Sequence, residues 1–366
     1  EISLGLVGSE MCIRDSRYPY LAATVTIPIG QLLFITTPSA AGLGLLLVAS
    51  VYPVLVGLGV SRLTALSVIA AATLFDQGPG SANTALAAEL INQTNVAYFI
   101  THQLPLAIPT TLVVMALFYF NNRYLDKKEA ARQNTETSGK TETPQSSTRP
   151  DIPLIFALLP VLPLALLILF SPYIGLFQPP ITLNTTTAMM FSLLISLVFV
   201  SCHTHNIRKT FDAFSSFWKG MGNVFANVVT LIVASEVFSK GLISLGFIDS
   251  LVDCSTHIGL SGIAIAAVFA LIIFCAAMLM GSGNAAFFSF GPLLPGIAGQ
   301  LGMPAYSLVL PLQLSASMGR AASPIAGIIV AIAGVAGVSP IELAKRNTLP
   351  LVGSILFLIA YHFITL

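Results

Sequence analysis

The residues best suited to chemistry in this sequence are polar side chains that interrupt long apolar stretches. Segment 281–296, GSGNAAFFSFGPLLPG, places Ser282, Gly283 and Asn284 between two hydrophobic runs. Irregular backbone at membrane depth has to be packed inside protein or line a polar cavity, because lipid offers no hydrogen-bond partners. Discontinuous helices of this kind build the substrate sites of secondary transporters. The segment therefore predicts a transport site and not a simple membrane anchor.

These groups suit a small organic anion that has lost its water. Desolvating an ion costs several kcal/mol, so the site has to supply many hydrogen-bond donors. Interrupted helices offer free backbone N–H groups and about half a positive charge at each N-terminus. Small residues allow a ligand to approach the backbone closely. The alternative is that the small residues only pack helices against each other.

Arg320 lies in an otherwise uncharged stretch, directly before a second interruption at Ser323-Pro324. An arginine at the centre of a spanning helix costs about 2.5–3.5 kcal/mol on insertion scales, so it indicates a functional site. Its guanidinium can bind a carboxylate through two parallel hydrogen bonds. A pairing with a helix C-terminus, or a position nearer the membrane surface, would also explain it.

Two acidic residues are candidates for ion coupling. Asp76 precedes GPGSANT, a further possible break, and could carry a proton or hold a cation beside the site. A helix terminus at the interface explains Asp76 equally well. Glu236 has the spacing to pair with Lys240 on one helix face, which is the alternative to a coupling role. The sequence predicts no cofactor or metal and leaves the coupling ion, H⁺ or Na⁺, open.

Composition places these segments in a membrane protein. The chain is 55% hydrophobic and 8% charged, with a mean hydropathy of +0.87, whereas soluble domains carry roughly 25% charged residues. Several apolar stretches reach the ~20 residues that a spanning helix needs. The net charge of +1 predicts no nucleic-acid partner. We therefore expect an all-α polytopic membrane protein, an inverted-repeat transporter with broken helices and a re-entrant hairpin.

The chain divides into four parts by composition. Residues 1–16 combine charge with an interrupted apolar run, and we expect them to be a non-native leader. Residues 121–151 are rich in Ser, Thr, Pro and charge, which predicts a hydrophilic linker. Its Lys and Arg residues favour the cytoplasmic side. We expect a partial N-terminal repeat over 17–120 and a C-terminal repeat over 152–366.

The repeat rests on two similar segments. Residues 28–42 read PIGQLLFITTPSAAG, and residues 311–327 read PLQLSASMGRAASPIAG. Each has an early Pro and Gln, then a Thr-Pro or Ser-Pro step, and a later Gly-Val-Ser. Proline removes a helical hydrogen bond and biases the residue before it away from helix. This predicts helices broken at Pro38 and Pro324, and it places the counterpart of the GSGN hairpin before residue 17.

The motifs GSGNAAF, LPLQLSASMGRAASPIAG, TTPSAAGLGLLLVA and DQGPGSANTALAAE resemble the DcuC family of anaerobic C4-dicarboxylate transporters, within the ion-transporter superfamily. The resemblance covers residues 17–366, the linker aside. It implies a multi-pass carrier of the bacterial cytoplasmic (inner) membrane for succinate, fumarate or malate, working by alternating access as a homodimer. In the superfamily, hairpin tips with Ser-Asn-Thr-like sequences and broken helices hold the substrate. This chain has Gly-Asn-Ala at that tip.

These arguments define the site that the sequence predicts. The substrate-binding candidates are Thr37, Pro38, Ser39, Ser282, Gly283, Asn284, Arg320, Ser323 and Pro324, with Asp76 and Glu236 as possible coupling residues. A carrier for another small anion such as citrate is the alternative within transport. An intramembrane protease is disfavoured because GSGN lacks the Asp of a Gly-x-Gly-Asp signature and HExxH is absent. A non-transporting scaffold is disfavoured because broken helices are costly without a cavity.

Overall fold

The computed structural model describes residues 19–133, 162–170, 185–204, 225–246 and 261–365, with isolated positions between 183 and 253. The predicted leader and most of the predicted linker lie outside the described residues. The regular structure of the described part is helical throughout. The helices are α2 (Pro19–Thr36), α3 (Ala40–Ser50), α4 (Tyr52–Gly57), α5 (Arg62–Ala72), α6 (Ala82–Leu90), α7 (Asn95–Tyr98), η1 (Phe99–Gln103), α8 (Leu104–Gln133), α9 (Leu162–Leu169), α10 (Thr185–Thr204), η3 (Phe225–Val229), α12 (Thr230–Ser244), α14 (Gly262–Met280), α15 (Gly283–Phe290), η4 (Gly291–Leu293), α16 (Leu294–Gln300), α17 (Tyr306–Ala321), α18 (Gly327–Ala336) and α19 (Pro340–Thr365).

Four helical segments of the described part are long and apolar enough to cross a membrane: Pro19–Thr36, Asn95–Glu129, Gly262–Met280 and Pro340–Thr365. The second of them joins α7, η1 and α8 into one span. Many large apolar side chains on these segments are exposed, which is the arrangement that lipid requires. The structure therefore confirms an all-α polytopic membrane protein.

The order of helices repeats between the two halves of the chain. In the C-terminal half, α14 ends at a tight tip, α15 to α16 return, the pair α17 and α18 follows, and α19 is a long single helix. In the N-terminal half, α2 ends at a tip, α3 and α4 return, the pair α5 and α6 follows, and α7 to α8 form the long helix. The turn before each pair contains a glycine with positive φ, Gly59 (87°) and Gly302 (66°), a conformation that glycine adopts without strain.

This order corrects one expectation from the sequence. Residues 37–39 form the tip between α2 and α3, so they correspond to the tip at 281–282 and not to the break at Ser323-Pro324. The counterpart of that break is segment 73–81, between α5 and α6. The expectation that the first hairpin precedes residue 17 was wrong, because a proline step ends a helix at a tip as readily as it interrupts a spanning helix. The proposed domain boundaries stay a prediction.

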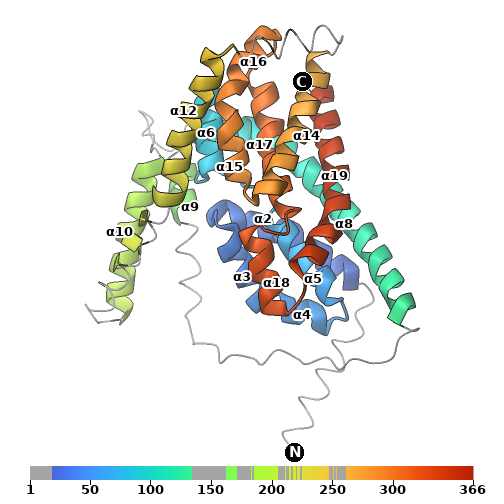
Figure 1. Ribbon diagram of the computed structural model, residues 1–366. Coiled ribbons are helices and arrows are strands. Elements are labelled where there is room, and N and C mark those ends of the chain that lie inside the picture. The colour runs from blue at the N-terminus through green and yellow to red at the C-terminus, as the bar shows by residue number, and fades with distance from the viewer. Residues whose placement is uncertain are drawn as a thin grey trace, which may run out of the picture.

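The two broken pairs run in opposite directions (Figure 1). The pair α5 and α6 leads from the lower to the upper half of the view, whereas α17 and α18 lead from the upper to the lower half. The helices α14, α15 and α16 lie with α17 and α6 in the upper half, and α3, α4 and α18 lie in the lower half. The long helices α8 and α19 pack against each other along one side. The interruptions of both pairs therefore lie at mid-height.

Glycines allow the upper hairpin to pack tightly against α17. A Cβ atom on Gly319 would lie 2.2 Å from the carbonyl oxygen of Phe274, and one on Gly283 would lie 2.9 Å from the carbonyl oxygen of Ala316. Both contacts are with backbone, which cannot move aside cheaply. Close approach through small residues is typical of helices that pack within membranes. It fixes the hairpin tip beside the C-terminal end of α17.

A buried ionic cluster joins four helices at the lower end. Arg346 of α19 forms an ion pair with Asp126 of α8, and its Nε donates to Oδ1 of Asn122 at 2.8 Å. The hydroxyls of Tyr20 in α2 and Ser61, the N-cap of α5, also donate to Asp126, at 3.1 and 2.8 Å. The side chains of Arg346 and Asp126 are only 2% and 8% exposed. We call Arg346, Asp126, Asn122, Tyr20 and Ser61 the lower clamp.

We expect Arg346→Ala to destabilise the folded protein strongly. Removing one partner of a buried ion pair leaves the other charge uncompensated, which typically costs about 3–5 kcal/mol. The measurement is the thermal unfolding midpoint of the purified protein in detergent. Lys345→Ala is the matched control, since Lys345 is the neighbouring basic residue and is exposed. Equal midpoints for the two variants would show that the lower clamp contributes little.

Candidate functional site

The interruptions meet through the side chain of Asn83, in the first turn of α6. Its Nδ2 donates to Oδ2 of Asp76 at 3.0 Å and to Oδ1 of Asn284 at 3.1 Å. Asp76 lies in the break between α5 and α6, and Asn284 lies in the first turn of α15. One amide group therefore ties the N-terminal break to the tip of the C-terminal hairpin.

Arg320 makes the second link between the halves. It lies in the last turn of α17, and its Nη2 donates to the carbonyl oxygen of Thr73, the C-cap of α5. Its Cζ lies 5.6 Å from the ring centre of Phe34 in α2. Pairing with a helix C-terminus, the alternative considered for this residue, is the contact observed. The Nε of Arg320 is buried and has no hydrogen-bond partner.

The tip of the upper hairpin is built by Gly281 and Ser282. Gly281 has φ of 68° and ends α14, and Ser282 is the N-cap of α15, where its Oγ accepts from the N–H of Ala285 at 3.2 Å. A serine oxygen at this position satisfies one of the free donors of a helix N-terminus. Gly283 is buried against α17. Ser282 and Gly283 thus shape the tip, and Asn284 is its polar side chain.

Ser323 and Pro324 shape the break between α17 and α18. Ser323 is fully buried, and its Oγ accepts from the N–H of Ile325 at 3.3 Å. Asn347 of α19 supports the same break, because its Nδ2 donates to the carbonyl oxygen of Ala321 at 3.2 Å. Pro324 is half-buried. This break lies beside Arg320 and against the hairpin tip, since a Cβ on Gly281 would lie about 3.0 Å from Ile325.

Thr37, Pro38 and Ser39 lie at the tip of the α2–α3 hairpin and are exposed. The Oγ of Ser39 accepts from the N–H of Gly42 at 3.3 Å and so caps α3. The hydrogen bonds of these side chains stay within their own tip in the described part of the chain. The residue just before the tip, Ile35, packs against the break between α5 and α6.

Of the two candidate coupling residues, the structure describes the side chain of Asp76 but not that of Glu236. Asp76 is only 6% exposed and lies inside the break, so it is not an exposed helix end at the interface. Its Oδ1 has no hydrogen-bond partner. Glu236 falls within α12, which packs against α15, but its side chain lies outside the described residues. A role for Glu236 stays a prediction.

Buried polar atoms without a partner gather in this region. Such atoms are uncommon, because burying an unpaired polar group is costly, and each one calls for an explanation. Within the described residues they are Asp76 Oδ1, Gln77 Oε1, Asn83 Oδ1 and Arg320 Nε at the breaks, Gln313 Nε2, Ser315 Oγ and Ser317 Oγ along α17, and Gln31 Nε2 in α2. Donors and acceptors held ready in this way are what a polar ligand requires.

The sequence argument missed Asn83, Thr84 and Gln103. The Oε1 of Gln103 accepts from the N–H of Gly78 at 3.3 Å and lies 3.2 Å from the hydroxyl of Thr84. Ser81 caps α6 by accepting from the N–H groups of Asn83 and Thr84. The run Ser-Ala-Asn-Thr directly after Gly-Pro-Gly was the available signal, because a serine cap after a turn marks a helix N-terminus. Gln103 lies in the π-helical turn η1, for which the sequence has no comparable signal.

The arrangement favours binding of an anion. The N-termini of α6 and α15 converge where Asn83 contacts Asn284, and helix N-termini attract negative charge. Arg320 adds a full positive charge beside them. Among the residues that the structure describes, no group of three or more His, Cys, Asp or Glu side chains could hold a metal ion.

Comparison with known proteins shows the family of the chain. The chain matches the family DcuC, described as C4-dicarboxylate anaerobic carrier, over residues 12–366, which begins inside the segment predicted to be a leader. It is 33% identical over 345 residues to "Anaerobic C4-dicarboxylate transporter DcuC" of Escherichia coli (strain K12), covering 93% of this chain and 72% of that protein. It is 32% identical over 335 residues to a "Probable anaerobic C4-dicarboxylate transporter DcuC" of Vibrio cholerae, covering 91% and 71%. A "Putative uncharacterized transporter" of Haemophilus influenzae is 27% identical over 291 residues, covering 76% and 97%. The chain belongs to the DcuC family of C4-dicarboxylate anaerobic carriers.

Proposed function

We propose that this protein carries C4-dicarboxylates such as succinate, fumarate or malate across the bacterial cytoplasmic membrane by alternating access. The observation that carries the proposal is the contact of Arg320, which joins the C-terminus of α5 to the last turn of α17. A charged side chain at membrane depth is costly, so it indicates a functional site. The family membership gives the class of substrate.

Substrate binding would exchange one partner of Arg320 for another. In the described structure the guanidinium donates to the backbone carbonyl of Thr73. A carboxylate is a stronger acceptor and can take two parallel hydrogen bonds from the fork of the guanidinium. Binding would therefore release the C-terminus of α5 from α17 and loosen a contact between the two halves. The second carboxylate would meet the free N–H groups and amides near Asn83 and Asn284.

Asp76 is our candidate for the coupling residue. Its Oδ2 is held by Asn83, whereas Oδ1 is buried and unpaired. A bound proton or Na⁺ at Oδ1 would offset the added charge of a dianion beside it, because buried like charges repel strongly at short range.

We also propose a homodimer, by analogy with the resemblance to the family. Chemical crosslinking in native membranes, with a dimer band as the expected result, tests that assembly.

Arg320→Ala should abolish uptake of labelled succinate by reconstituted liposomes. Hydrogen bonds to a charged group contribute about 1.5–3 kcal/mol, so we expect at least a tenfold loss of apparent affinity. Arg320→Lys keeps the charge but loses the fork, and it should recover only part of the activity. A sharp, unchanged elution peak on size exclusion in detergent is the folding control. Normal uptake by the folded Ala variant would overturn the role of Arg320. In a separate competition experiment on the unaltered protein, displacement of succinate by citrate at equal concentration would broaden the substrate class.

Asn284→Leu should weaken substrate affinity without abolishing folding. Loss of one neutral hydrogen bond costs about 0.5–1.5 kcal/mol, which predicts a rise in KM of about 2- to 12-fold. Asn83→Leu removes the same contact from its other side and should have a similar or larger effect, because Asn83 also holds Asp76. Ser289→Ala serves as a control on the same helix, away from the tip. An unchanged KM in both variants would make the tip a packing element.

A further inference from the structure

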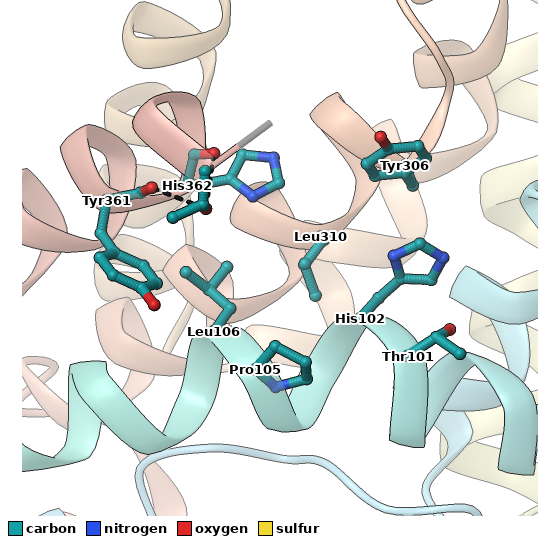
Figure 2. Close-up of a pocket in the computed structure, with 9 residues that line it drawn as sticks. Thr101, His102, Pro105, Leu106, Tyr306, Leu310, Tyr361 and His362 are labelled. Carbon is teal, nitrogen blue, oxygen red and sulfur yellow. Dashed lines mark hydrogen bonds between the residues drawn. The ribbon is translucent and has the colours of Figure 1, made fainter.

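A cavity lies at the end of the molecule opposite the lower clamp. Its volume is about 310 Å³, near the lower bound of roughly 300–1,000 Å³ for small-ligand pockets. The start of α8, the start of α17 and the end of α19 surround it (Figure 2). The polar residues of its lining are Thr101, His102, Tyr306, Tyr361, His362 and Thr365. We call this cavity the upper pocket.

The lining of the upper pocket contains no acidic residue. The hydroxyls of Thr101 and Thr365 donate to the backbone carbonyls of Ala97 and Tyr361, so the donors left for a ligand belong to His102, Tyr306 and Tyr361. The Nε2 of His362 lies 3.1 Å from the carbonyl oxygen of Ser307, so that nitrogen carries the hydrogen, because a carbonyl only accepts. The Nε2 of His102 lies 3.3 Å from the amide nitrogen of Gln93. This leaves Nδ1 of His102 as the N–H donor of the neutral ring. The ring of His102 stacks on Tyr306, with 4.7 Å between their centres.

Figure 2 shows how these groups face the cavity. His102 and His362 come from different helices and lie on two sides of Leu310, with Tyr306 beyond His102. His362 is only 5% exposed and forms a fixed part of the wall. The stacking of His102 on Tyr306 fixes the orientation of its ring. The pocket is therefore a built cavity with oriented polar groups and not a gap between mobile surface side chains.

One face of α17 connects the upper pocket to Arg320. Residues at intervals of three or four lie on the same face of a helix. Starting from the pocket, this face carries Tyr306, Leu310, Gln313, Ser317 and Arg320. The hydroxyl of Tyr98 donates to Oε1 of Gln313 at 2.8 Å, which fixes the amide so that its Nε2 is the remaining donor. Gln313 and Ser317 are at most 1% exposed, yet Gln313 Nε2, Ser317 Oγ and Arg320 Nε all lack a partner.

We infer that the upper pocket is an outer binding subsite for the dicarboxylate, and that the polar face of α17 is its path to Arg320. The inference rests on the proposed function for the class of substrate. Donors without acidic neighbours suit a carboxylate, and the row of unpartnered donors leads from the cavity to the central arginine. The opposite end of α8 carries Arg123, Lys127 and Lys128 and is predicted to be cytoplasmic. The upper pocket then faces the outside of the cell.

Equilibrium binding of labelled succinate to the purified full-length chain tests this inference. We expect two sites per chain in the unaltered protein, the outer one weaker. His102→Phe keeps an aromatic ring against Tyr306 but removes the donor, and it should weaken the outer site at least tenfold while leaving the central one. Arg320→Ala should leave only the outer site. Tyr124→Phe, at the opposite end of α8, is the control and should leave both sites unchanged.

The sidedness of transport gives a second measurement. In oriented vesicles, His102→Phe should raise the KM for succinate added from the outside by about tenfold and leave the KM from the inside unchanged. A single site per chain in the unaltered protein, or two unchanged sites in a His102→Phe variant that elutes normally, would overturn the outer subsite. Binding at two sites without any uptake would instead contradict the proposed transport and leave the outer subsite standing.

Discussion

The whole arrangement depends on one constraint: backbone groups freed by an interrupted helix at membrane depth must find partners within the protein. Each interruption here is satisfied by a side chain that lies elsewhere in the fold or at its own cap. Arg320 donates to the carbonyl of Thr73, and Asn347 donates to the carbonyl of Ala321. Ser81 and Ser282 accept from the first N–H groups of α6 and α15. These four polar residues are thus placed where the interrupted backbone requires them.

This solution makes the two halves of the chain depend on each other. Asn83 and Asn284 are 201 positions apart in the sequence, and Arg320 and Thr73 are 247 apart, yet both pairs are hydrogen-bonded. Each bond crosses from one repeat to the other at mid-height. A ligand that replaces either bond changes how firmly the halves are joined, and a ligand can shift a conformational equilibrium only through such differential contacts. Two carboxylates on one small molecule could replace both bonds at once.

The local signals in the sequence predicted the interruptions but not their partners. The runs GSGN, Asp76 with GPGS, and Ser323-Pro324 were recognisable because Gly, Pro and Ser mark helix ends by local sterics and capping. The sequence argument assigned Pro38 to a broken spanning helix, but it lies at the hairpin tip after α2. A proline step shows that a helix is interrupted, but it does not show whether the chain then turns back or continues in the same direction. Gln103 and Arg346 gave no signal, since each is an ordinary polar residue whose partners are set by packing. Arg346 pairs with Asp126, which is 220 positions away.

The two ends of the molecule are closed by different means, and this difference fits the proposed alternating access. At the lower end, the charges of Arg346 and Asp126 are buried against each other, and the lower clamp binds α2, α5, α8 and α19 together. Opening that end would expose both charges and break several hydrogen bonds at the same time. At the upper end, the cavity between α8, α17 and α19 is lined by no Lys, Arg, Asp or Glu side chain, and His362 in its wall contacts the carbonyl oxygen of Ser307. In the arrangement proposed above, a polar solute would reach Arg320 from the upper end along α17, and a carrier has to reverse this asymmetry between its ends in each cycle.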